Sequence, residues 1–270
     1  MRRFAFYSAL LFATVAQSAS LSDGPTPAER MELAPTGKLR VGVVSAPAQS
    51  AFFVVKDADG HPRGVTVDLG KALARQLGVP DEFIVASNSG ELVDAASSAA
   101  LDVAFMPIDD ERRKRVDFGP AYFIIESTYL VRAGSDINTL NDVDRPSVRV
   151  VGIANTATIR GAGRSLKNTT IAPAKSVDDA MEMLRSGAAD AFALMHDSLL
   201  PLAAQLPGSR ILDGSFLQTG IAIAVPKHRP NAFAYATAFI ENAKASGIVR
   251  RAFDDAGLKN LVVAPPGNSS

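Results

Sequence analysis

Asp102-Val103-Ala104-Phe105-Met106 and Asp190-Ala191-Phe192-Ala193-Leu194 follow one pattern, an aspartate and then four apolar residues. Each copy comes after a segment whose apolar residues recur at helical spacing. A capping residue opens each of these helices, Asn88 (with Glu91 three residues on) in the first and Ser176 in the second. The same offset in residue number separates the two caps and the two aspartates. This repetition is too weak for a tandem repeat, but it favours two similar lobes.

The flanking segments continue the alternation of strands and helices. Apolar residues at helical spacing predict a helix over Val65–Val79, which Gly78 and Pro80 terminate. Apolar and β-branched runs predict strands over Leu39–Val44, Phe83–Ala86, Leu101–Met106 and Val148–Ile153. Alternation of this kind predicts an α/β fold with a mainly parallel sheet.

Two strand-like stretches connect the predicted lobes. One comprises Ala121–Ile125 and Thr128–Val131, and the other is Ile221–Val225, which precedes a helical region over Asn231–Ala256. If that region packs on the first lobe, the chain crosses between the lobes twice, and two crossings form a hinge. We therefore expect a first lobe over residues 37–126 and 224–263 and a second lobe over 127–223. A polar leader over 21–36 precedes the first lobe, and a tail over 264–270 follows it.

The N-terminus is typical of a secretory signal peptide. Basic Met1-Arg2-Arg3 precedes an apolar run, Phe4–Ala16, and then small and polar residues. The run is shorter than the ~20 apolar residues that cross a bilayer, which favours export over a membrane anchor. We expect residues 1–20 to be the signal peptide, the mature protein to be periplasmic, and no membrane insertion after cleavage.

Composition excludes several classes of protein and site. The chain has no cysteine, which rules out disulfides, thiolate metal sites, cysteine nucleophiles and lipid attachment through a cysteine. Its 28 basic and 28 acidic residues balance, so nothing suggests a nucleic acid as partner. The chain carries no glycine-flanked serine elbow, HExxH motif or phosphate-binding loop. We therefore expect a monomer that is not an enzyme and needs no cofactor or metal.

The stretch from Asp102 to Phe118 resembles a motif of the family 3 extracellular solute-binding proteins, which serve polar amino acid import by ABC transporters. It has the family's strand, a turn that ends in Glu111-Arg112, a basic stretch and an Asp-Phe pair. Gly64–Leu69 and Ser186–Ala191 are similar to two further family motifs. The resemblance covers Leu39 to Leu258. It implies a two-lobed periplasmic-binding-protein (type II) fold, in which each lobe is a mainly parallel sheet flanked by helices and a two-strand hinge joins the lobes.

The resemblance implies that Arg112 binds a ligand carboxylate, since a guanidinium offers a planar fork of donors. It also implies that Asn155, Thr156 and Thr158 belong to a loop whose hydroxyl and N–H groups bind the same carboxylate. The alternative is that a threonine only caps its own helix.

Two further positions match places that face the ligand in the family. Phe52 and Phe53 follow the first strand, where the family often has a ring over the ligand, and we expect only one of them, Phe52, to touch it. Asn88 matches a position that often lines the pocket, but helix capping explains Asn88 equally well.

Two departures from the family concern the ligand's amine. Met106-Pro107 stands where the family usually has a Ser or Thr that hydrogen-bonds the ligand, and proline has no N–H to donate. Leu194-Met195 occupies the region of the aspartate that usually pairs with the ligand ammonium, and Asp197 is the nearest acid. We therefore expect a small carboxylate-bearing ligand, an amino acid or related organic acid, that is not held as a standard free α-amino acid: it has no amine, or its cation is placed elsewhere, for example at Asp197.

The expected role is capture of this ligand for the permease subunits of an ABC transporter. A periplasmic dehydratase-like enzyme on the same fold and a ligand-sensing subunit of a membrane signalling system are the alternatives. His196 and Asp197 are adjacent and could form the acid/base pair of an enzyme, although such pairs are usually surface or interlobe contacts.

Overall fold

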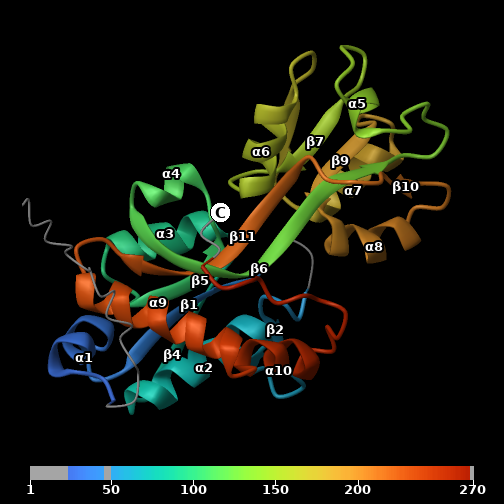
Figure 1. Ribbon diagram of the computed structural model, residues 1–270. Coiled ribbons are helices and arrows are strands. Elements are labelled where there is room, and N and C mark those ends of the chain that lie inside the picture. The colour runs from blue at the N-terminus through green and yellow to red at the C-terminus, as the bar shows by residue number, and fades with distance from the viewer. Residues whose placement is uncertain (1–23, 46–49, 268–270) are drawn as a thin grey trace, which may run out of the picture.

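The computed structural model describes residues 24–45 and 50–267 (Figure 1). They form two α/β lobes joined by two long strands, β6 (Val116–Val131) and β11 (Leu217–Pro226). No helix within these ranges has the length and apolar character needed to cross a bilayer. The predicted signal peptide, residues 1–20, lies outside the described residues.

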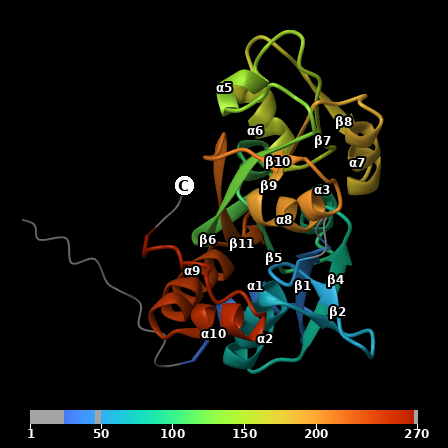
Figure 2. The same cartoon turned by 90° about the vertical axis from the view of Figure 1, so that its right-hand side faces the viewer.

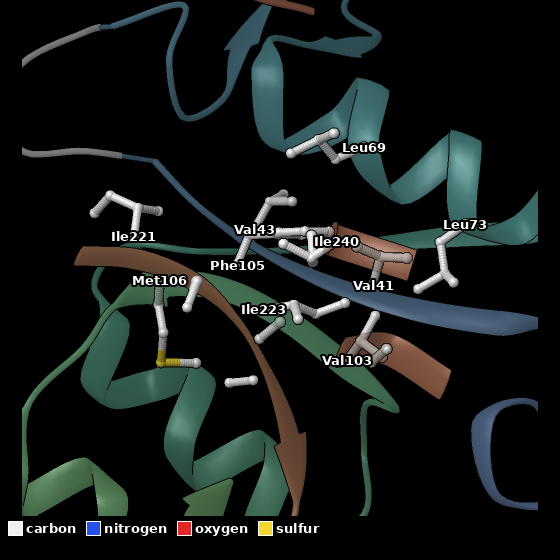
Figure 3. Packing of buried hydrophobic residues seen from close by; sticks show 14 of the residues in the cluster. Val41, Val43, Leu69, Leu73, Val103, Phe105, Met106, Ile221, Ile223 and Ile240 are labelled. Carbon is white, nitrogen blue, oxygen red and sulfur yellow. The ribbon is translucent and has the colours of Figure 1, made fainter. Parts of the chain in front are cut away.

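The first lobe is built on parallel strands. The strand β1 pairs in parallel with β4 on one side and β5 on the other. Its strands are β1 (Leu39–Val44), β2 (Val55–Lys56), β3 (Pro62–Arg63), β4 (Asp81–Ala86) and β5 (Val103–Pro107). Its helices include α2 (Val65–Leu77), α3 (Ser89–Ser97) and α4 (Asp110–Arg113). Figure 3 shows Val41 and Val43 of β1 beside Phe105 of β5, below Leu69 of α2, in the buried core of this lobe.

The second lobe repeats the arrangement on a smaller scale. The strand β7 pairs in parallel with β8 and with β9, and β9 pairs with β6 in the antiparallel sense. Its strands are β7 (Val150–Ile153), β8 (Ile171–Ala174), β9 (Ala191–Met195) and β10 (Arg210–Ile211). Its helices are α5 (Leu140–Val143), α6 (Ala157–Ser165), α7 (Val177–Arg185) and α8 (His196–Ala204). The capping residues that were predicted, Asn88 and Ser176, both accept a backbone N–H at their helix starts.

The two connecting strands make one continuous sheet of both lobes. Among the described residues its strand order is β4-β1-β5-β11-β6-β9-β7-β8, and β10 pairs with β6. The sequence predicted two short segments in place of β6, with Glu126 and Ser127 between them. The structure has one strand of 16 residues, because Glu126 and Ser127 pair with Gln218 and Leu217 of β11.

The chain returns to the first lobe after β11, as the sequence predicted. Phe239 and Ile240 of α9 (Pro230–Ala245) and Phe253 of α10 (Ile248–Asp255) lie in the first-lobe core. Figure 2 shows both helices against that lobe. The predicted single helical region is broken at Gly247, whose left-handed φ of 76° suits glycine. The two crossings and the two-lobed α/β fold are therefore confirmed.

The predicted polar leader and tail both carry ordered contacts. A helix, α1 (Pro27–Leu33), begins at a Thr26–Glu29 capping box, and Leu33 is fully buried in the first-lobe core. The Glu32 carboxylate also accepts the backbone N–H of Ala232 on α9. At the other end, Ala264 is buried and donates its N–H to a backbone carbonyl of β6. The capping box and Pro27 are local signals for α1 that the prediction did not use, whereas the contacts of Glu32 and Ala264 with distant residues have no local signal.

Candidate functional site

Arg112 lies where β5 ends at the cleft between the lobes. It is on the short helix α4, which Asp109 caps by accepting the backbone N–H of Glu111 at 3.1 Å and of Arg112 at 3.4 Å. The cap and the burial of the turn fix the Arg112 side chain, which is 5% exposed. The motif that predicted this residue therefore places a nearly buried guanidinium at the carboxyl edge of the first-lobe sheet.

The Arg112 guanidinium has backbone carbonyls as its hydrogen-bond partners. It donates to the carbonyl of Pro107 at 3.0 Å and, across the cleft, to the carbonyl of Asn155 at 3.3 Å. Within the described part of the chain, no carboxylate oxygen lies within 4.0 Å of it. Burial, and next the charge of Arg160, lower the pKa of Arg112 to about 10, against the opposing effect of Asp109. A cation in this state is suited to an anionic ligand.

The second lobe presents the loop before α6. Asn155 is exposed and has a φ of 62°. Its backbone carbonyl accepts the hydrogen bond from Arg112. Thr156 is the N-cap of α6: its hydroxyl accepts the N–H of Ile159 at 3.2 Å and donates to the carbonyl of Ile153 at 2.8 Å. The Thr156 side chain therefore caps its own helix, which is the alternative to carboxylate binding given above.

Thr158 is 6% exposed, and its hydroxyl lies 3.4 Å from that of Ser127. Ser127 is itself fully buried in β6. The Thr158 side chain therefore faces the strand that joins the lobes in this arrangement.

The structure has a cavity of 500 Å³ around Arg112. A cavity of this size can hold a small metabolite. Asn88 and Asn155 also line it, so three of the predicted site residues come together there. Asn88 caps α3 by accepting the N–H of Glu91 at 3.0 Å, and its amide donates to the Glu91 carboxylate at 2.9 Å. Asn88 therefore both caps α3 and lines the cavity.

Sequence reasoning did not assign several charged residues to this cavity, among them Glu91 and Arg160. Glu91 accepts hydrogen bonds from the hydroxyl and backbone N–H of Ser87 and from Asn88, and the Ser87 bonds lower the pKa of Glu91. The sequence identified Glu91 only as a cap partner, and its spacing from Asn88 was the signal available. Arg160 had no signal, because its partner is in the other lobe.

Phe52 and Asp197 lie at a second cavity, of 480 Å³, between α8, β6 and the C-terminal segment. Phe52 is 5% exposed and its ring lies 4.7 Å from that of Phe123, so it is also a core residue. Asp197 is exposed, and His196 Nδ1 lies 3.2 Å from its carboxylate. The predicted residues are thus divided between two cavities.

Met106 lines neither cavity. Its side chain is fully buried and points into the first-lobe core (Figure 3). A prediction that the Met106 side chain touches ligand therefore finds no support, because alternate residues of a strand face opposite sides and this one faces inward.

Known proteins share this sequence pattern and this fold. The family model of the bacterial extracellular solute-binding proteins, family 3, matches residues 39–255. A glutamine-binding protein of Geobacillus stearothermophilus is 26% identical over 80% of this chain and 82% of its own.

Two solved structures are similar over most of the chain. The P235GK mutant of ArgBP from T. maritima has a TM-score of 0.70 and 25% identity, with 85% of this chain and 99% of that one covered. An ancestral amino acid-binding protein described as a precursor of cyclohexadienyl dehydratase has a TM-score of 0.68 and 26% identity, with 83% and 96% covered. Matched in sequence over most of its length and in structure over both lobes, the chain belongs to the bacterial extracellular solute-binding proteins of family 3.

Proposed function

We propose that this protein captures a small carboxylate-bearing molecule between its lobes and delivers it to an ABC importer. The observation that carries the proposal is that Arg112 is a nearly buried guanidinium at a cavity between the lobes, whose hydrogen-bond partners in residues 24–45 and 50–267 are carbonyls. A ligand carboxylate would supply the charge-assisted, bidentate partner that this guanidinium lacks. The glutamine-binding relative supports a ligand of that size and chemistry.

We also propose that the ligand is not held as relatives hold a free α-amino acid. An ammonium needs an acid partner, because an unpaired buried charge costs several kcal/mol. Asp190 is unsuited to this role, since it is paired with Arg149 and Arg132. Asp197 lines the other cavity, which does not include Arg112.

An acid that shares the cavity of Arg112 is a better place for a ligand cation. Asp94 and Glu111 line it but are paired with Arg115 and Lys114. Among the described residues, Glu91 accepts hydrogen bonds from the neutral Ser87 and Asn88 and forms no ion pair. A ligand with an amine would therefore extend from Arg112 toward Glu91.

A thermal-shift panel of amino acids and organic acids tests the ligand class. A true ligand at ~100 times its Kd stabilises the protein by about 2.7 kcal/mol. We expect stabilisation by carboxylates without an amine, or by amines whose effect depends on Glu91→Gln and not on Asp197→Asn. Strong binding of several ordinary L-amino acids that is unchanged in both variants would contradict this proposal.

Export and transporter docking complete the proposed role. The mature N-terminus should lie between Ala19 and Leu21, which mass spectrometry of the periplasmic fraction can read. Neighbouring genes for a permease and an ATPase would support an importer, whereas a neighbouring sensor kinase would favour a ligand-sensing subunit. An unprocessed Met1 in the membrane fraction would contradict export.

We propose that the protein does no chemistry on its ligand. His196 and Asp197 could act as an acid/base pair, but they are 45% and 62% exposed and line the cavity that lacks Arg112. Incubation of the protein with its ligand, followed by NMR, should show the ligand unchanged. Appearance of a dehydrated or hydrolysed product, lost in His196→Ala, would establish the enzymatic alternative.

A further inference from the structure

The carboxylate of Asp109 is shared between the two lobes. Its Oδ1 accepts two backbone N–H groups at the start of α4, and its Oδ2 accepts the Nε of Arg160 on α6 at 3.0 Å. The Asp109 side chain is 2% exposed and that of Arg160 is 30% exposed. The hydrogen bond and charge of Arg160 outweigh burial and keep the pKa of Asp109 below its usual value.

This ion pair differs in placement from the others. Every other ion pair between described residues joins two groups of the same lobe, as Asp102 with Arg40 and Asp190 with Arg149 do. The Asp109–Arg160 pair joins residues 51 positions apart on opposite sides of the cleft. Opening of the lobes would therefore break it, and would leave the other ion pairs intact.

The same two segments meet a second time through Arg112. Its guanidinium reaches the carbonyl of Asn155, the residue before the N-cap Thr156 of the α6 helix that carries Arg160. Asp109 in turn fixes the backbone N–H of Arg112. A movement of α6 away from α4 would thus remove both contacts together and leave the Arg112 guanidinium held by the carbonyl of Pro107 within its own lobe.

The charges around Asp109 are unbalanced. Arg112 and Arg160 both lie close enough to interact with the single carboxylate of Asp109, and they repel one another. A ligand carboxylate on Arg112 would supply a second negative charge. The closed arrangement should therefore gain stability when an anion is bound, since an opposite charge offsets repulsion in a site of low dielectric.

We propose that Asp109 and Arg160 are positioning residues, forming an ion pair that holds the lobes together and sets the Arg112 guanidinium for the ligand. Its effect on lobe closure is independent of the proposed function. Its effect on affinity rests on the proposed role of Arg112.

Two conservative variants isolate the ion pair. Asp109→Asn keeps an N-cap acceptor for α4 but removes the charge, since asparagine caps as well as aspartate. Arg160→Gln removes the charge on the other side. Asp110→Asn and Arg164→Gln are matched controls, because both are exposed neighbours on the same two helices and neither makes an ion pair that the structure records.

The chain has no cysteine, so spin labels can be attached at Ser98→Cys in the first lobe and Lys175→Cys in the second. Double electron–electron resonance without ligand should then give a longer, broader distance distribution in Asp109→Asn and Arg160→Gln than in the parent and both controls. The double variant should match the single variants. Equal distributions in the parent and both ion-pair variants would overturn the proposal.

The second half of the test uses a carboxylate that the thermal-shift panel identifies. Both ion-pair variants should raise its Kd about fivefold or more, because the apparent Kd rises as the competent fraction falls. Lobe opening in the variants with an unchanged Kd would refute the positioning of Arg112. If no panel carboxylate binds the parent protein, the proposed function fails, while the ligand-free distances still decide whether the ion pair closes the lobes.

Discussion

The amino ends of the two sheets carry nearly the same cluster of charges. In the first lobe, Asp102 accepts the backbone N–H of Arg40 at 3.0 Å and two of its guanidinium nitrogens at 2.9 and 2.8 Å. In the second lobe, Asp190 accepts the same three groups of Arg149 at 3.0, 2.9 and 2.9 Å. A further arginine completes each cluster, Arg229 in the first lobe and Arg132 in the second.

The carboxyl ends of the two sheets, which face the cleft, do not resemble one another. The first lobe presents Arg112 with no carboxylate partner among the described residues, and the second presents the uncharged loop from Asn155 to Thr158. The lobes therefore agree where the charges stabilise a sheet and differ where they face a ligand. This difference predicts that stability and binding can be separated by mutation.

The largest effect should come from the more buried cluster. Asp102 is fully buried and its arginines are 15% and 18% exposed, so Asp102→Asn would leave two partly buried guanidinium groups without their carboxylate. We expect the free energy of unfolding to fall by about 3–5 kcal/mol, as for other buried pairs that lose one partner. Urea denaturation measures it. A loss below about 1 kcal/mol would show that the cluster contributes little to the fold.

Arg112→Ala should have the opposite profile. We expect ligand binding to weaken by about 2–5 kcal/mol, the cost of removing one partner of a buried charge pair, with little loss of stability. Arg112→Lys should also bind poorly, because an ammonium cannot reproduce the planar fork. Calorimetry with the identified ligand measures both variants. Arg113, which stacks on Phe118 at 5.8 Å, is the control, and an equal loss of affinity in Arg113→Ala would place the site elsewhere.

The second-lobe cluster should show itself in the pH dependence of stability. Hydrogen bonds from Arg149 and Arg132 outweigh burial and hold the pKa of Asp190 well below its usual range. The folded state then binds fewer protons than the unfolded state, so this stabilisation is present above about pH 4 and is lost as the pH falls further. Asp190→Asn should cost about 1–2 kcal/mol at pH 7, because Arg149 is 54% exposed. Its unfolding free energy should vary less than the parent's between pH 5 and 2, and parallel curves would contradict the assignment.

The smallest effect should come from the uncharged loop of the second lobe. Thr156→Ala removes the N-cap of α6 and should reduce stability by about 1 kcal/mol. Affinity should change little, because the hydroxyl already accepts the N–H of Ile159 and donates to the carbonyl of Ile153. Thermal unfolding and calorimetry together measure the two effects. A large loss of affinity with unchanged stability would mean that Thr156 contacts the ligand and does not serve as a cap.

Local patterns in the sequence were enough to predict much of the fold. The strand over Leu39–Val44 and the repeated cap-helix-strand units depend on apolar spacing and capping, which neighbouring residues determine. The helix α1 within the predicted leader was not predicted, although Thr26 and Glu29 form a capping box, and its contact with α9 through Glu32 depends on residues far along the chain. The continuity of β6 likewise depends on its pairing with β11.

The candidate site was predictable only in part. Arg112 stands in a recognisable motif, so its place at the cleft followed from the sequence. The contribution of Arg160 depends on how the lobes meet, since Asp109 is 51 residues away. Met106 was named because Met106-Pro107 stands where the family usually has a ligand-binding Ser or Thr, whereas the direction of its side chain depends on the register of β5 in the sheet.

The most direct test of the account is a crystal structure of the protein with the ligand that copurifies with it. We predict a carboxylate with both oxygens within about 3.2 Å of the Arg112 guanidinium, between closed lobes. A ligand bound without any contact to Arg112, for example beside Phe52 and Asp197 in the 480 Å³ cavity, would contradict it.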